Sequence, residues 1–268
     1  MPIFDDAIHL DPTGDGRYAG ATHPAYANMV GPFGGITAAT LLNAALLHPQ
    51  RLGDPIALTV NFAGAPADGP FEVLARAART NRSTQHWIVE LAQDGELCAS
   101  ATAVFATRRE TWSASESEMP QNVGTAADIA RAPLVGRPQW CARYDMRFVE
   151  GGMPERFDGV PQPHSRSTLW VRDEPPRPLD FASLAAIADS FFPRIFVRRR
   201  KVVPIGTVTL STYFHAGAAD LQAQGERPVL GTARALCFRN GYFDQSAEVW
   251  GDDGRLLASS HQMVYYRE

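Results

Sequence analysis

Asp189 is the residue of this sequence whose setting points most strongly to chemistry. It stands in the middle of DFASLAAIADSFFPRIF (residues 180–196), where the apolar residues predict a helix with no solvated side. A carboxylate in such surroundings is costly unless it is paired, hydrogen-bonded or used. It could hold a water molecule or accept a proton, or it could bond a buried hydroxyl and only determine packing. This stretch alone favours neither interpretation.

Pro193 adds an irregularity beside that carboxylate. Proline has no N–H, so the carbonyl four residues earlier, which belongs to Asp189, loses its helical partner. We therefore expect the helix to loosen or kink next to Asp189.

The Gly34–Gly35 pair is a second candidate. It stands near the start of GPFGGITAATLLNAALLHP (residues 31–49), a stretch that predicts a closely packed helix with a small-residue surface. Bare N–H groups at a helix N-terminus can bind an anion or a carbonyl oxygen. The commoner meaning of an isolated glycine pair is a tight entry turn.

Other residues that could carry chemistry are weaker candidates. We interpret His215 and His261 as structural or surface residues. The basic run at residues 198–201 could bind phosphates, although such a run is more often a solvated loop. Three widely spaced cysteines form neither a disulfide framework nor a zinc pattern, so we expect no metal and no cofactor.

Size and composition set broad limits. The chain has 268 residues, of which 45% are hydrophobic and 20% charged, as is usual for globular proteins. A net charge of −4 provides no basic surface for nucleic acid. The acidic start lacks the features of a signal peptide, and no apolar run reaches the ~20 residues of a membrane span. We expect a cytoplasmic protein without nucleic-acid or membrane partners.

Stretches rich in β-formers form two sets, the first after the helix predicted at residues 31–49 and the second on both sides of the helix predicted around Asp189. The first set lies at residues 55–62, 71–81, 83–92 and 97–108, and the second at 146–149, 167–172, 207–215, 229–238, 242–251 and 256–267. Between the sets, residues 111–140 are polar and interrupted by prolines, which predicts a linker that could include one short helix.

The two sets repeat one another in sequence. LTVNFAGAPAD (58–68) matches LSTYFHAGAAD (210–220), and DGELCASATAVFATR (94–108) matches DGRLLASSHQMVYYR (253–267). This pattern predicts two copies of one α+β unit. We expect a first repeat over residues 1–110, a linker over 111–140 and a second repeat over 141–268. The two antiparallel sheets would join edge to edge, each wrapped around its own helix.

The repeats differ at two inward positions. In the alignment of the two repeats, Gln262 occupies the position of Ala103, which lies on an apolar strand face. Asp189 has no acidic counterpart, because residues 31–47 carry no charge. Two polar groups added to one interior favour a single active site in a duplicated fold, with neutral drift as the alternative.

Four segments in order resemble the acyl-CoA thioesterase II family, the double hot-dog thioesterases. They are PHSRSTLWVRD (163–173), the stretch around Asp189, IGTVTLSTYFH (205–215) and LLASSHQMVYYR (256–267), and the resemblance covers nearly the whole length. The sequence departs from the family in a shorter spacing between Asp189 and Thr207. It also has Ala216–Gly217 where the family has Arg-Pro, so no coenzyme A contact is assigned there.

The resemblance implies that Asp189, Thr207 and Gln262 hold the attacking water of a thioester hydrolase. Asp189 would act as general base, while the other two orient the water. The bare N–H groups of Gly34–Gly35 would polarise the thioester oxygen. Simple alternation along 207–215 points Thr207 away from the helix, unless a bulge or its place at the start of the strand turns it inward.

Two alternatives remain open at this stage. One is a hot-dog hydratase or dehydratase acting on acyl-CoA, which would need a histidine near Asp189. The other is a protein that binds acyl-CoA without catalysis. The resemblance also implies a homodimer, because exposed hot-dog sheets usually pair.

Overall fold

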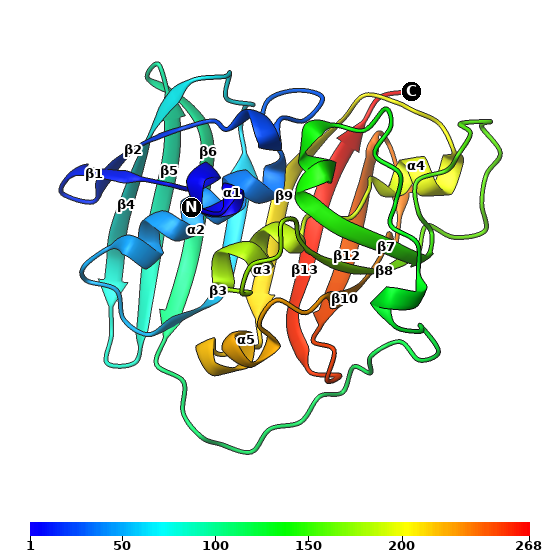
Figure 1. Cartoon of the computed structure of the whole chain (residues 1–268). Coiled ribbons are helices and arrows are strands. Elements are labelled where there is room, and N and C mark those ends of the chain that lie inside the picture. The colour runs from blue at the N-terminus through cyan, green and yellow to red at the C-terminus, as the bar shows by residue number, and fades with distance from the viewer.

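Thirteen strands form one continuous antiparallel sheet in the computed structural model, which describes residues 1–268 (Figure 1). Along the sheet the order is β1-β2-β4-β5-β6-β3-β9-β13-β12-β10-β8-β7, and β11 pairs with β12. The strands are β1 (Asp11–Gly14), β2 (Arg17–Ala21), β3 (Asp54–Phe62), β4 (Pro70–Thr80), β5 (Thr84–Gln93), β6 (Glu96–Ala106), β7 (Tyr144–Glu150), β8 (Ser167–Asp173), β9 (Ile205–Phe214), β10 (Val229–Arg234), β11 (Phe238–Arg239), β12 (Tyr242–Trp250) and β13 (Leu256–Tyr266).

Two central helices lie against the sheet, one in each half of the molecule, and contact each other (Figure 1). The helices are α1 (Ile3–Ala7), α2 (Gly34–Leu47), α3 (Phe181–Ile187), α4 (Arg194–Arg199) and α5 (Ala218–Gln224). We call β1–β6 with α1 and α2 the first half, and β7–β13 with α3–α5 the second half. Helix α2 packs on β4, β5 and β6, whereas α3 contacts β8. This is the predicted α+β arrangement.

Strands β3 and β9 join the two halves edge to edge. Their register pairs Ala57 with Tyr213 and Val60 with Leu210. The hydroxyls of Thr59 and Ser211 lie 2.9 Å apart across the junction. One cluster of 52 buried hydrophobic residues extends through both halves, so they share a core.

The sequence repeat is also a repeat of strand register. In the first half Ala103 of β6 lies opposite Leu58 of β3 and Trp87 of β5. At the equivalent place in the second half, Gln262 of β13 lies opposite Leu210 of β9 and Gln245 of β12. Bulges recur as well: Ile56 in β3 and Val208 in β9 are the extra residues at matching positions.

The predicted single helix over residues 180–196 is wrong. Helix α3 begins after the N-cap Asp180, whose side chain accepts from the Ser183 N–H at 2.8 Å, and it ends at Ile187. Asp189 lies in the turn that follows, and α4 starts only after Pro193. Pro193 lacks the N–H that would bond the Asp189 carbonyl, as expected. Proline also disfavours the helical conformation of the residue before it, here Phe192. The helix therefore breaks beside Asp189 instead of bending there.

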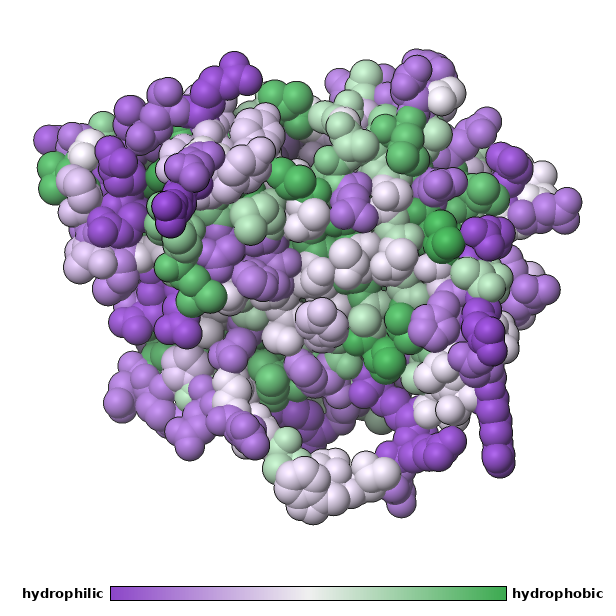
Figure 2. All heavy atoms as spheres, turned by 180° about the vertical axis from the view of Figure 1, so that it is seen from behind, coloured by the Kyte–Doolittle hydropathy of each residue, from purple (hydrophilic) through white to green (hydrophobic).

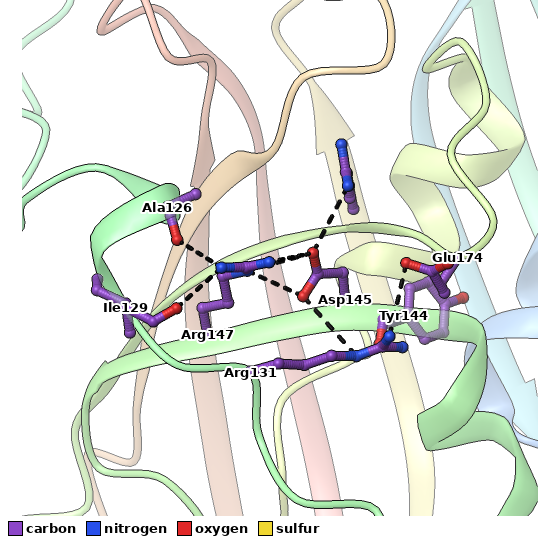
Figure 3. A network of polar contacts seen from close by, with 8 residues as sticks. Ala126, Ile129, Arg131, Tyr144, Asp145, Arg147 and Glu174 are labelled. Atoms are coloured by element: carbon purple, nitrogen blue, oxygen red, sulfur yellow. Dashed lines mark hydrogen bonds and ion pairs between the residues drawn. The ribbon is translucent and has the colours of Figure 1, made fainter.

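The segment between the halves is held to the second half by a charged network (Figure 3). Arg147 of β7 donates to the carbonyls of Ala126 and Ile129, both at 3.0 Å, and to the buried carboxylate of Asp145 at 3.0 Å. Arg131 of the segment lies 3.8 Å from the same carboxylate. Apart from short 3₁₀ turns at Ala126–Asp128 and Gln139–Arg143, the segment has no regular structure, but it is anchored to β7.

The rest of the surface is mixed in character. On the side opposite to that of Figure 1, hydrophobic residues are interspersed among hydrophilic ones (Figure 2). None of the helices combines the length and the apolar character that are needed to cross a lipid bilayer.

Candidate active site

The carboxylate of Asp189 and the amide of Gln262 meet at the centre of the site. The Gln262 Nε2 group donates to Asp189 Oδ1 at 2.7 Å. Asp189 comes from the turn after α3, where its N–H donates to the Ala186 carbonyl at 3.1 Å, and Gln262 comes from β13. Burial raises the pKa of Asp189 to about 7, while Gln262 and the Gly35 N–H act to lower the pKa. The carboxyl group can therefore exchange a proton near neutral pH.

The N-terminus of α2 lies directly against this carboxylate. A β-carbon at Gly34 would lie 2.8 Å from Asp189 Oδ2, and one at Gly35 would lie 2.7 Å from the carbonyl oxygen of Ala186. Both glycines are thus required by the close approach of α2 to α3 and its following turn. The first N–H groups of a helix have no intrahelical acceptor. Gly34 lines the cavity, and the Gly35 N–H acts on the Asp189 carboxylate.

Thr207 faces the same space because of the bulge in β9. Thr209 pairs with Met263 and Thr207 pairs with Val264, so the extra residue Val208 lies between them. This shifts the alternation, and Thr207 lies on the face that holds Leu210 further along the strand. Its hydroxyl has no hydrogen-bond partner within the protein, which leaves it free to bind a water molecule or a substrate.

A cavity of about 220 Å³ contains four of the five residues predicted from the sequence: Gly34, Asp189, Thr207 and Gln262. Gly35 does not line it. Most of its wall is apolar and aromatic, formed by Phe33, Trp140, Phe191, Phe192, Phe196 and Phe243 among others. Exposed side chains at its rim include Met29 and Val202, each 58% exposed. The geometry thus places the acid of Asp189, the amide of Gln262 and the hydroxyl of Thr207 in a mostly hydrophobic pocket, as is typical of small-molecule sites.

Arg137, Trp140 and Gln245 are polar or aromatic lining residues that were not predicted from the sequence. Arg137 and Trp140 come from the segment before β7, and Gln245 comes from β12. The segment showed only polar and proline-rich composition, so nothing indicated that it returns to the cavity. Strand pairing places Gln245 at the position of Trp87, but these two strands lie outside the segments whose letters visibly repeat.

The remaining candidates lie elsewhere or are inert. His215 bonds the Ser259 hydroxyl at 3.0 Å and His261 bonds Asp244 at 3.2 Å, and neither lines the cavity. In the basic run, Arg199 and Arg200 are ion-paired with Glu268 and Asp158 respectively. Cys141 does line the cavity, but burial raises its pKa to about 12. The thiol therefore stays protonated and is a poor nucleophile.

Comparisons with known proteins agree with this architecture. A family model of the acyl-CoA thioesterase N-terminal domain matches residues 23–106, and one of the C-terminal domain matches residues 114–266. No curated protein matches the chain. A solved structure from Alicyclobacillus acidocaldarius, described as a conserved protein of unknown function with a hot-dog fold, is 48% identical with a TM-score of 0.94. The match covers 100% of this chain and 99% of that one.

Two more distant structures share the fold. A proposed thioesterase II from Thermobifida fusca is 20% identical, with a TM-score of 0.82 over 100% of this chain and 98% of that one. An acyl-CoA thioesterase II from Mycobacterium marinum is 19% identical, with a TM-score of 0.78 over 98% of each chain. Together with the 48% identical structure, they confirm the predicted double hot-dog fold.

Proposed function

The chain belongs to the acyl-CoA thioesterase family, and from this premise we propose that it hydrolyses acyl-CoA to a free acid and coenzyme A, using a water molecule held by Asp189, Gln262 and Thr207. The observation that carries the proposal is the 2.7 Å contact between Gln262 and Asp189 in the wall of the cavity. The free Thr207 hydroxyl on the same wall supplies a third polar group around the water.

In the proposed reaction Asp189 accepts a proton from the water as the water oxygen attacks the thioester carbon. Gln262 donates to one carboxylate oxygen and so fixes the orientation of the other. The N–H of Gly34 stabilises the negative oxygen of the tetrahedral intermediate. Collapse breaks the carbon–sulfur bond, and the proton on Asp189 passes to the departing thiolate. The free acid and the thiol are then released.

The cavity composition favours hydrolysis over hydration of an enoyl group. The hydratase alternative requires a histidine beside the acid, and no histidine lines the cavity. The pKa of Asp189, about 7, suits a group that must take up and return a proton. A protein that only binds acyl-CoA would have no use for such a carboxyl group in an apolar cavity.

Release of free thiol from acyl-CoA by the purified protein tests the proposal. We expect turnover with at least one chain length in a panel from short to long acyl groups. Asp189→Ala should reduce kcat by about 100-fold or more, because general-base catalysis contributes about that factor. A circular dichroism spectrum unchanged from the wild type would show that the variant folds. Absence of thiol release across the whole panel would refute the proposal.

We extend the proposal to organisation and location. Residues 1–110 and 141–268 form two repeats joined by a linker, as the matching strand registers support. We also propose a homodimer in the cytoplasm. The sheet face opposite the cavity carries exposed aromatic side chains that could pair in a dimer, such as Tyr213 and Tyr265, which are 50% and 40% exposed. Light scattering coupled to size exclusion should give twice the 29.2 kDa chain mass; the monomer mass would exclude the dimer.

A further inference from the structure

Gln245 is a buried amide in the cavity wall that the proposed reaction does not use. It lies on β12 directly opposite Gln262, and only 3% of its surface is exposed. Its side chain lines the cavity and forms no hydrogen bond with the protein. This contrasts with Gln262, which is 4% exposed and bonded to Asp189.

An amide in this position requires a partner that the protein does not supply. Buried polar side chains nearly always form hydrogen bonds, because leaving them without a partner costs stability. Packing does not demand an amide here, since the first half places Trp87 at the equivalent position. The missing partner is therefore a group that enters the cavity.

The position of Gln245 indicates which part of a substrate would reach it. Val202 at the edge of the cavity is 58% exposed, whereas Gln245 and Gln262 in its wall are 3% and 4% exposed. The bulky coenzyme A portion must remain toward the rim, so Gln245 faces the acyl portion. The amide also lies one strand away from Gln262, a spacing of about 4.8 Å. An oxygen on the third carbon of an acyl chain is three bonds from the thioester carbon, so it can reach the amide of the neighbouring strand while the thioester carbon stays beside Gln262.

We propose that Gln245 binds a hydroxyl or keto oxygen on the third carbon of the acyl group, so that the site prefers such acyl-CoA substrates over saturated ones of equal length. The inference rests on the proposed function, because it assumes that the thioester carbon lies beside Asp189 and Gln262. An amide can donate to a keto oxygen and can also accept from a hydroxyl, so both groups suit it. A saturated chain would leave Gln245 without a partner.

The test compares kcat/KM for 3-hydroxyacyl-CoA, 3-oxoacyl-CoA and saturated acyl-CoA of one chain length in wild type and Gln245→Met. Methionine has a similar volume but cannot replace the amide hydrogen bonds. We expect wild type to favour the substituted substrates by about tenfold or more, and Gln245→Met to abolish that preference while retaining turnover of the saturated one. Gln222→Met, the same exchange on an exposed residue of α5, should change nothing.

Two results would overturn the inference. An equal loss on all three substrates would mean that Gln245 binds a group common to every thioester, and no loss on any would mean that it only packs. Calorimetry of the three substrates binding to Asp189→Asn, with and without Gln245→Met, compares their affinities in a protein that does not turn them over. If wild type releases no thiol from any of the substrates but Asp189→Asn shows a binding preference that depends on Gln245, the proposed function is refuted and this inference is upheld. The absence of any such preference would overturn the inference itself.

Discussion

Asp189 combines two properties that normally exclude each other, burial among apolar groups and access to a substrate. The broken end of α3 removes it from the helix, and the glycines of α2 leave room for its carboxylate. Burial raises its pKa to about 7, whereas one amide and one backbone N–H limit the rise. The carboxyl group is thus held close to the point where it can be either acid or base.

This pKa makes stability depend on pH in a direction that can be tested. The pKa of Asp189 is higher in the folded than in the unfolded chain, so its favourable contribution is complete below about pH 4 and is lost as pH rises through 7. Asp189→Asn removes the ionisation. We expect the variant to gain stability relative to wild type between pH 4 and 7, by at most roughly 4 kcal/mol.

Urea denaturation of both proteins at pH 5 and pH 8 measures this difference. The buried Asp173, whose pKa burial raises to about 6, is present in both proteins and cancels in the comparison. A stability difference between the two proteins that is the same at pH 5 and pH 8 would contradict the raised pKa of Asp189.

Single polar residues were predictable from the sequence only where their surroundings made them conspicuous. Asp189 stood out in an apolar stretch, and Gln262 stood out against Ala103 in the repeat. Simple alternation along the strand pointed Thr207 away from the cavity, and only a bulge, which the sequence does not locate, turns it inward. Gln245 gave no such signal, because the matching residue, Trp87, lies outside the segments whose letters visibly repeat.

At the scale of elements, the cavity depends on segments that interrupt regular structure. Pro193 separates α3 from α4, and the segment before β7 returns to cover the cavity with Trp140, which stacks on Phe33 at a centroid distance of 4.2 Å. The strands were predictable from their β-forming residues and the two central helices from their apolar composition, although the second helix ends at Ile187 and does not reach residue 196. This covering segment was not, since its position is set by tertiary contacts such as those of Arg147.

Arg137 on that segment provides a test of where coenzyme A enters. Its guanidinium lies 5.8 Å from the centroid of the Phe192 ring, lines the cavity and has no acidic partner. We expect it to bind a phosphate of coenzyme A. Arg137→Gln should raise the KM for acyl-CoA by about tenfold, because hydrogen bonds to charged groups are worth that much. It should leave the KM for the same acyl group on N-acetylcysteamine, which has no phosphates, unchanged.

Arg131→Gln is the matched control for this measurement. Arg131 lies on the same segment, but its guanidinium is close to Asp145 and Glu174 instead of the cavity. The KM for both substrates should stay at the wild-type value in this variant. An equal rise in KM for the two substrates in Arg137→Gln would show that Arg137 shapes the acyl pocket and does not contact phosphate.

For the whole molecule, duplication has produced one site that neither half contains alone. Phe33 and Gly34 come from the first half, whereas Asp189, Thr207 and Gln262 come from the second. The equivalent space in the first half is filled by Trp87, which is 1% exposed and packs against Phe105 at a centroid distance of 6.1 Å. The first half therefore acts as a scaffold that supplies the N-terminus of α2.

Replacing Trp87 should separate this scaffold role from catalysis. Trp87→Ala opens a hole in a closely packed core, and we expect it to cost about 3–5 kcal/mol of unfolding free energy. The values of kcat and KM at a temperature where the variant is folded should equal those of wild type, since the space it opens has no acid beside it. Urea denaturation and steady-state kinetics measure the two effects, and Trp87→Phe provides a milder variant if the alanine protein does not fold.

Calorimetry should show one acyl-CoA per chain in both Asp189→Asn and its combination with Trp87→Ala. A second bound ligand in the combination, or altered kinetics of Trp87→Ala, would mean that the first half still forms part of a binding site.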